Sequence, residues 1–356
     1  MLGLTLLVVF LIAMLALASV DSSLAQDTQS APDAIGSVKV DCDSPEVVFH
    51  QLNDYQPYIA GGPVVTVWLG KRVALVLDGE KPGQRDPEVM ARICATFDDI
   101  FNSYQRIIQR KPKLDAPLMG RIRIEVSSQV GGGLANHGQL GVAVGTGFFN
   151  GLYNRVKAGK NTYDQVFFYE IARNFWMPDM NDSIDYHTSQ GPDDWGWWTV
   201  GFNNAMSVVM SKQVPGIDDM FYFGQNGRSF AAGMETNLDQ YLAHPEKYDW
   251  ENSWCVRLLP WKANTSLNDL MTGLLLRLER EHGGVTFISA LYREIPRQRP
   301  LPKNKSDYQA VRDNFYAAAS LAAKQDLWSF FTSDLRWLLT DSVHNRVRHE
   351  LGLGRQ

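Results

Sequence analysis

The chain lacks several signals that would assign a function directly. It has no excess of positive charge, because its formal net charge is -5 over 356 residues, so nucleic acid is not expected as a partner. It contains no G-x-S-x-G sequence and no cysteine in a recognisable catalytic context, which removes the usual nucleophilic hydrolases. It also has no internal repeat. What remains is the composition of a globular protein of one large domain or two, rich in aromatic residues.

Long apolar runs are confined to the N-terminus. Residues 2–20 form one unbroken apolar run, and small-x-small cleavage candidates follow, so residues 1–25 are predicted to be a secretory signal peptide and the protein to be secreted. No Lys or Arg precedes the run, and the run is long for a signal. An uncleaved N-terminal anchor is therefore the alternative, and only in that case is contact with a membrane expected. Residues 26–36 are polar and small, which predicts a disordered lead-in.

The three cysteines are Cys42, Cys94 and Cys255, and export would place them in an oxidising compartment. Cys94 falls on the apolar face of a predicted helix, where it acts as a small apolar residue. Cys42 and Cys255 are therefore the candidate disulfide, although the sequence leaves the pairing open.

Residues 37–160 are predicted to be a β-rich part with one long helix. Short β-branched runs give strands at 64–68 and 72–77, and Asp86 followed by Pro87 gives the start of the helix. Residues 121–126 alternate charged and apolar side chains, which predicts a strand with one solvated face. A glycine turn at 131–133 and a further strand at 139–144 follow.

Residues 161–356 are predicted to hold a central helix and a mostly helical C-terminal lobe. Thr162 and Gln165 form a capping-box pattern, so the central helix is expected to begin at Thr162. The expected later helices are 201–210, one that starts at Ser266 or Asn268 and ends before Gly283, 287–295, 307–323, 327–339 and 343–351. The fold class is therefore α+β.

The central helix carries the sequence Tyr169-Glu170-Ile171-Ala172-Arg173. This is the frame of H-E-x-x-H, in which two histidines on one helix face bind zinc and the glutamate acts as general base. Here the position of the base is kept, while both histidines are replaced.

A strand, a glycine-rich turn, another strand and then this helix resemble the gluzincin zinc metallopeptidases, in particular the enhancin- and mucin-directed branch. The sequence Gly201-Phe202-Asn203-Asn204 stands where that branch has the helix that supplies a third metal ligand, a glutamate. The resemblance implies a gluzincin-like core, with a twisted mixed β-sheet before the central helix. It makes Glu170 a vestigial general base and Tyr169, Arg173 and Gly201 vestigial metal-ligand positions.

These replacements are not expected to bind zinc. A phenol with a pKa near 10 is a poor ligand, a guanidinium has no lone pair to donate, and glycine has no side chain. No cofactor is therefore expected. Arg173 lies three residues after Glu170, which is close enough for an ion pair in the volume that a metal would fill. A solvent-facing turn with no such ancestry is the alternative.

The stretch after the central helix combines acidic residues and tryptophans. The candidates for a binding cleft are Asp193, Asp194, Trp195, Trp197 and Trp198. The tryptophans suit stacking on sugar rings or clamping of an extended peptide, and a buried aromatic plug is the alternative. The acidic residues do not have the spacing of an EF-hand loop, so a solvated loop is expected.

The expected function is a catalytically inactive metallopeptidase homologue that keeps its cleft as a structural or binding surface, for an extracellular protein, glycoprotein or glycan. One alternative is an active peptidase or glycosidase that uses Glu170 with nearby aspartates and without the usual zinc site. A purely structural extracellular matrix protein is the other.

Overall fold

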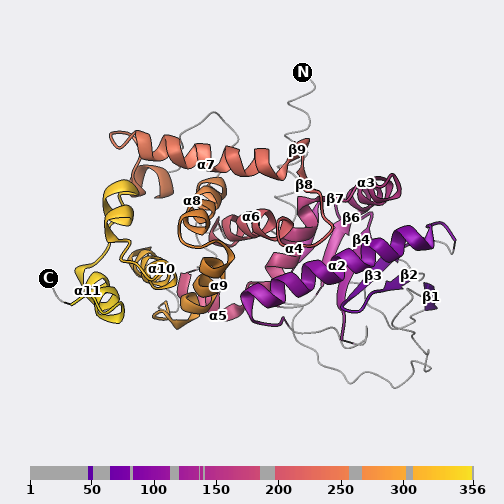
Figure 1. Ribbon diagram of the computed structural model, residues 1–356, viewed down its shortest axis with the longest axis horizontal. Coiled ribbons are helices and arrows are strands. Elements are labelled where there is room, and N and C mark those ends of the chain that lie inside the picture. Colours follow the sequence, from indigo (N-terminus) through magenta and orange to yellow (C-terminus); the bar gives the residue numbers. More distant parts are fainter. Residues whose placement is uncertain are drawn as a thin grey trace. The chain divides into compact units, whose positions relative to one another are not determined.

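The computed structural model describes residues 47–50, 65–80, 83–112, 120–135, 137–138, 141–184, 197–255, 267–301 and 308–354. All of them belong to one compact unit, Ser44–Gln356 (Figure 1). The predicted signal peptide, the lead-in and Cys42 lie outside the described residues. Among the described helices, none has the length and apolar character that crossing a bilayer requires.

The first half of the chain builds a six-stranded mixed sheet in the order β1-β2-β3-β4-β6-β5. The strands β3, β4 and β6 are parallel, and β1, β2 and β5 join them in antiparallel pairs. Their bounds are β1 Val47–His50, β2 Val65–Leu69, β3 Val73–Asp78, β4 Ile122–Ser127, β5 Gly133–Ala135 and β6 Val142–Gly145. Among the described strands β5 stands at one edge, so its outer side faces no other strand of this sheet.

A long helix, α2 (Pro87–Ile108), packs along the sheet. It begins as predicted, because the Asp86 side chain accepts a hydrogen bond from the Glu88 backbone N–H and Pro87 occupies the first turn. Its apolar face is buried against β3 and continues past the sheet to helix α9 (Val285–Glu294). Cys94 lies on this face and is buried as a free thiol.

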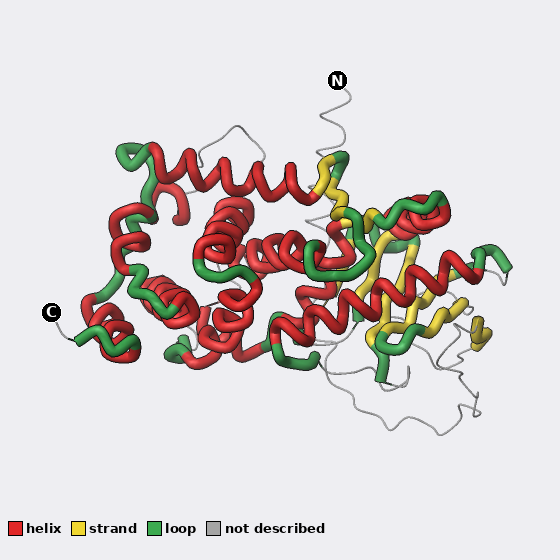
Figure 2. Tube along the Cα trace, in the orientation of Figure 1, coloured by secondary structure: helices red, strands yellow, loops and turns green. Residues whose placement is uncertain are grey.

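Figure 2 shows most strands gathered in one region of the unit, where α2 and α3 (Thr146–Lys157) accompany them, and the other helices outside it. The remaining helices are α4 (Gln165–Phe175), α5 (Pro178–Ile184), α6 (Trp197–Ser211), α7 (Gly227–Ala243), α8 (Leu267–Glu281), α10 (Tyr308–Ala323) and α11 (Asp341–Glu350). A second sheet of three short strands, β7 (Thr162–Asp164), β8 (Asp219–Tyr222) and β9 (Gln225–Asn226), lies beside α4. The chain is therefore α+β, with a mixed sheet followed by a mostly helical region.

The central helix starts later than the sequence predicts. Thr162 does not cap a helix, because residues 162–164 form β7 and pair in parallel with β8. Asp164 occupies the N-cap position without a capping bond, and its carboxylate instead binds Arg155. Strand pairing has therefore overridden the local capping pattern.

Two further expectations are wrong. The strand β4 has no solvated face, since all six residues are buried, including Arg123 and Glu125. It lies in the interior of the sheet, where β3 and β6 pair with both of its edges. Residues 327–339 are not one regular helix. They contain a short π-helical turn, Phe330–Asp334, followed by irregular chain.

Candidate functional site

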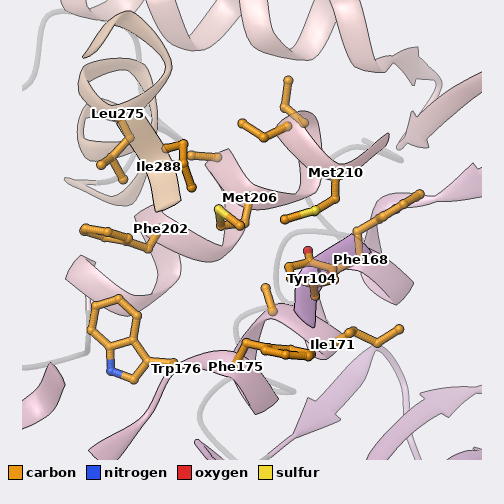
Figure 3. Close-up of a cluster of buried hydrophobic side chains, with 14 of the residues drawn as sticks. Tyr104, Phe168, Ile171, Phe175, Trp176, Phe202, Met206, Met210, Leu275 and Ile288 are labelled. Carbon is orange, nitrogen blue, oxygen red and sulfur yellow. Dashed lines mark hydrogen bonds between the residues drawn. The ribbon is translucent and has the colours of Figure 1, made fainter. Parts of the chain in front are cut away.

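Helix α4 lies between the sheet and the helical region, and its buried side forms the centre of the core. Phe168, Ile171 and Phe175 from α4 pack with Phe202 and residues farther along α6 (Figure 3). Behind them α2 contributes Tyr104, which stacks on Phe175 at 5.3 Å and donates a hydrogen bond to the Phe168 carbonyl at 2.8 Å. The orientation of α4 is therefore fixed from the sheet, from α2 and from α6.

Only three residues of α4 are not buried: Val166, Tyr169 and Arg173. They stand at positions i, i+3 and i+7, which share one face of a helix. This line of residues, called here the open face of α4, contains two of the positions that the sequence identified. Glu170 lies next to it but is only 3% exposed.

Glu170 and Arg173 form an ion pair, with the Arg173 Nη1 atom 3.5 Å from the Glu170 Oε2 atom. Burial raises the pKa of Glu170 to about 7, and the guanidinium of Arg173 acts in the opposite direction. The Arg173 side chain is 27% exposed, so the carboxylate is enclosed while its counter-ion reaches solvent. The sequence correctly predicted this pair from the spacing of the two residues.

Burial also raises the pKa of Tyr169 above its ordinary value near 10, although the charge of Arg173 opposes the shift. The Tyr169 side chain interacts with Asn203, which is fully buried on α6. Within the described part of the chain, neither polar atom of the Asn203 side chain has a well-formed hydrogen bond. The hydroxyl of Tyr169 therefore faces a polar seam between α4 and α6, to which Gln165 and Asn204 add a hydrogen bond of 2.9 Å.

Gly201 does not belong to this seam. A side chain at position 201 would point to helix α8, because a Cβ atom there would lie 2.5 Å from Cγ and 2.6 Å from Cβ of Met271. The polar side chains of α6 that contact α4 are instead those of Asn203, Asn204 and Ser207. The structure thus brings together Tyr169, Glu170 and Arg173. Gly201 instead lies where α6 packs against α8 and allows the two helices to approach closely.

Strand β5 covers the other flank of α4. A Cβ atom at Gly133 would lie 2.5 Å from Oε1 of Glu170 and 2.6 Å from Cγ2 of Val166. Only glycine allows this approach of the strand to the helix. The sequence predicted a turn at 131–133 and missed this role, because Gly133 lies far from α4 along the chain, with β6, α3 and β7 between them.

Replacing Gly133 with alanine is expected to lower the free energy of unfolding by about 2 kcal/mol, because the new methyl group must displace Glu170 or lift β5 from α4. Gly132→Ala is the matched control, since no atom lies within 4 Å of a Cβ at Gly132. It should change stability by less than about 0.5 kcal/mol. Urea unfolding of both variants checks this, and equal midpoints would contradict the close contact.

The candidate cleft residues after α4 fall largely outside the described residues, including Asp193, Asp194 and Trp195. Trp197 begins α6, and only its backbone is described. Trp198 is 4% exposed and packs edge-to-face on Phe315 at 4.9 Å and on Trp337 at 6.0 Å. It is thus part of an aromatic cluster in the helical region. The side chain of Cys255, the candidate partner of Cys42, is likewise not described.

No protein-family model matches the chain, and no curated protein matches it in sequence. Its fold is similar to that of a functionally unknown conserved protein from Bacillus anthracis str. Ames, with a TM-score of 0.53 and 13% identity over 82% of this chain and 52% of that one. This likeness concerns the fold alone.

Weaker similarity links the chain to two peptidase structures. For the ZmpB metallopeptidase from Clostridium perfringens the TM-score is 0.45, with 15% identity over 81% of this chain and 48% of that one. For a metallopeptidase from Bacteroides thetaiotaomicron the TM-score is 0.43, with 12% identity over 81% and 46%. The chain spans about half the length of the solved structures that it matches.

Proposed function

We propose that this chain is a secreted, catalytically inactive homologue of the gluzincin metallopeptidases, of the enhancin- and mucin-directed branch, and that the open face of α4 binds an extracellular protein or glycoprotein. The observation that carries the proposal is the Glu170–Arg173 pair. The carboxylate that would activate water is enclosed and bound to a guanidinium on the helix turn where a metal ligand would stand. The sequence of residues 1–25 supports export.

The donor set at this place does not fit zinc. Burial keeps Tyr169 protonated at neutral pH, because it raises the pKa of the phenol further. Arg173 has no lone pair to give, and Gly201 is directed to α8. Over the described residues there is no group of three or more His, Cys, Asp or Glu side chains arranged to hold a metal ion.

The edge of the sheet supports a polypeptide as the partner. Strand β5 pairs with β6 on one side only, as far as the described strands show, and it runs along α4 beside Val166 and Glu170. An extended peptide can add to such an edge through main-chain hydrogen bonds, while the adjacent residues select its side chains. Val166, Tyr169 and Arg173 would then contact the side chains of the bound segment.

Binding and hydrolysis of casein test the proposal. The wild-type protein should bind fluorescently labelled unfolded casein and leave it uncut, with or without added zinc. Tyr169→Ser should weaken binding about tenfold, because a contact of one aromatic ring is worth roughly 1.4 kcal/mol. Leu353→Ser, which removes an exposed apolar side chain far along the sequence, is the control and should bind as wild type does. Absence of binding to any extended polypeptide would overturn the proposal.

An active hydrolase remains the second candidate, and one observation favours it. A carboxyl with a pKa of about 7 is suited to act as general base near neutral pH. The aspartates that would assist it, Asp193 and Asp194, lie outside the described residues. Hydrolysis of casein or mucin glycopeptides that is lost in Glu170→Gln would establish this candidate in place of the inactive homologue.

A further inference from the structure

The turn between β8 and β9 presents an aromatic side chain to solvent. Phe223 is 63% exposed, more than any other large apolar residue in the described part of the chain. Its φ angle of 42° lies in the left-handed region, and Gly224 follows with φ 87°. A two-residue turn of this kind favours Asn or Asp before Gly, because their short polar side chains tolerate this backbone.

Phenylalanine is therefore an unfavourable choice for the fold at this position, both for its backbone conformation and for its exposure. The other described non-glycine residues with positive φ are polar or charged: Gln109, Lys324 and Arg336. A strained residue that also exposes an aromatic ring points to a role in contact with another molecule.

The turn lies next to the open face of α4. Strand β8 pairs in parallel with β7, which leads directly into α4, and Phe221 is the register partner of Asp164. Tyr222 is close enough to Tyr169 to affect its pKa, and the rings of Tyr222 and Phe223 meet edge-to-face with centroids 4.8 Å apart. Figure 1 shows β8 close to α4, while β9 leads into α7. Tyr222 and Phe223 thus flank the Tyr169 side of the open face.

Arg173 offers a partner one positive group on this face, while Asp269 adds a negative charge near Tyr222, whose pKa is raised by burial and by that charge. Arg173 is the only charged residue on the open face, and it also neighbours Tyr169. Its counter-ion Glu170 is enclosed, so a partner meets the guanidinium rather than the carboxylate. A carboxylate is the group that a guanidinium binds most specifically.

We propose that Phe223 is a specificity element: with Tyr222 it receives an aromatic side chain of an extended polypeptide whose nearby carboxylate pairs with Arg173. This inference rests on the proposed function, since it names the chemistry of the segment that binds along the open face. Among the described strands β5 pairs on one side only, which favours a polypeptide over a glycan, because the main chain of an edge strand is matched by another main chain.

The probes are capped peptides of alternating Thr and Val that carry one Phe and one Glu at varied separations, with matched peptides in which Phe is replaced by Ser or Glu by Gln. Fluorescence anisotropy measures their affinity for wild type and for Phe223→Asn. The variant suits the turn, so it should raise Tm by about 2 °C. It should bind the Phe peptides about tenfold more weakly and the Ser peptides as wild type does. Leu353→Asn should change neither affinity.

The outcomes separate the two claims. If wild type binds none of the peptides, the proposed binding function fails. If wild type binds them but Phe223→Asn does not change the preference for Phe, the specificity role alone is overturned. If the Glu and Gln peptides bind wild type with equal affinity, Arg173 does not recognise a carboxylate, and that part of the inference is wrong. Binding to phosphatidylcholine vesicles that depends on Phe223, without peptide discrimination, would overturn the assignment of a polypeptide partner.

Discussion

Arg173→Met is expected to lower the free energy of unfolding by about 2.4 kcal/mol at pH 8 and by about 1 kcal/mol at pH 5. The guanidinium holds down the pKa of an enclosed carboxyl, so its loss raises the pKa of Glu170 beyond about 7. A carboxyl whose folded pKa is raised contributes stability that is complete below its unfolded pKa near 4.5 and is lost as the pH rises through the folded pKa. Removing Arg173 enlarges that loss at pH 8, while at pH 5 Glu170 is protonated in the folded state.

Urea unfolding at the two pH values measures this effect. Arg297→Met is the matched control, because Arg297 also pairs with a glutamate three residues away, Glu294, at 3.0 Å but on the surface. It should cost less than about 1 kcal/mol at both pH values. Adding Glu170→Gln to Arg173→Met should restore most of the stability at pH 8, since the buried charge is then gone. An equal loss at both pH values would show that ionisation of Glu170 is not linked to the pair.

Gly201→Glu is expected to abolish folding, with a loss of at least about 4 kcal/mol. The substitution places a carboxylate where even a methyl group would overlap Met271, and it buries a charge between α6 and α8. Gly201→Ala should show a smaller loss of about 2 kcal/mol from overpacking alone. Restoring the glutamate of the resembled peptidases at this position therefore should not create a zinc site.

Circular dichroism and zinc analysis of the purified variants test this expectation. Gly233→Ala is the control within a helix, because no atom lies within 4 Å of a Cβ at Gly233; it should be neutral or stabilise the fold by up to about 1 kcal/mol. A folded Gly201→Glu variant that binds zinc stoichiometrically would contradict both the close contact of position 201 with Met271 and the proposal of an inactive homologue.

Elements whose signals are local were predictable from the sequence. Helix α2 has its cap at Asp86 and a continuous apolar stripe, and the structure confirms it. Helices α3 and α7 gave no comparable signal: α3 holds Gly147 and Gly151, and only four residues of α7 are buried, so its apolar stripe is weak. Both are stabilised by contacts that form only in the folded protein, α7 through its packing on α8.

The candidate site was predictable where it depends on positions along one helix. Spacing alone placed Glu170 and Arg173 together, but it did not show that Val166 joins Tyr169 and Arg173 on the open face. The side of α6 on which Gly201 lies faces α8 because of how these two helices cross. Gly133 lies against α4 because β5 is the strand of the sheet next to that helix. Both features depend on segments that are distant in the sequence, so neither could be predicted from one segment alone. The same holds for Tyr222 and Phe223, which reach α4 through the pairing of β7 with β8.

Helix α2 has a consequence for how the molecule folds. Its aromatic residues Phe97 and Phe101 contact Phe167 and Phe175 of α4, and its far end reaches α9. A fragment that begins after α2 would leave one side of α4 without the rings that cover it. We therefore expect the β-rich and helical halves of the sequence to melt together in one cooperative transition, and neither half to fold when it is expressed by itself.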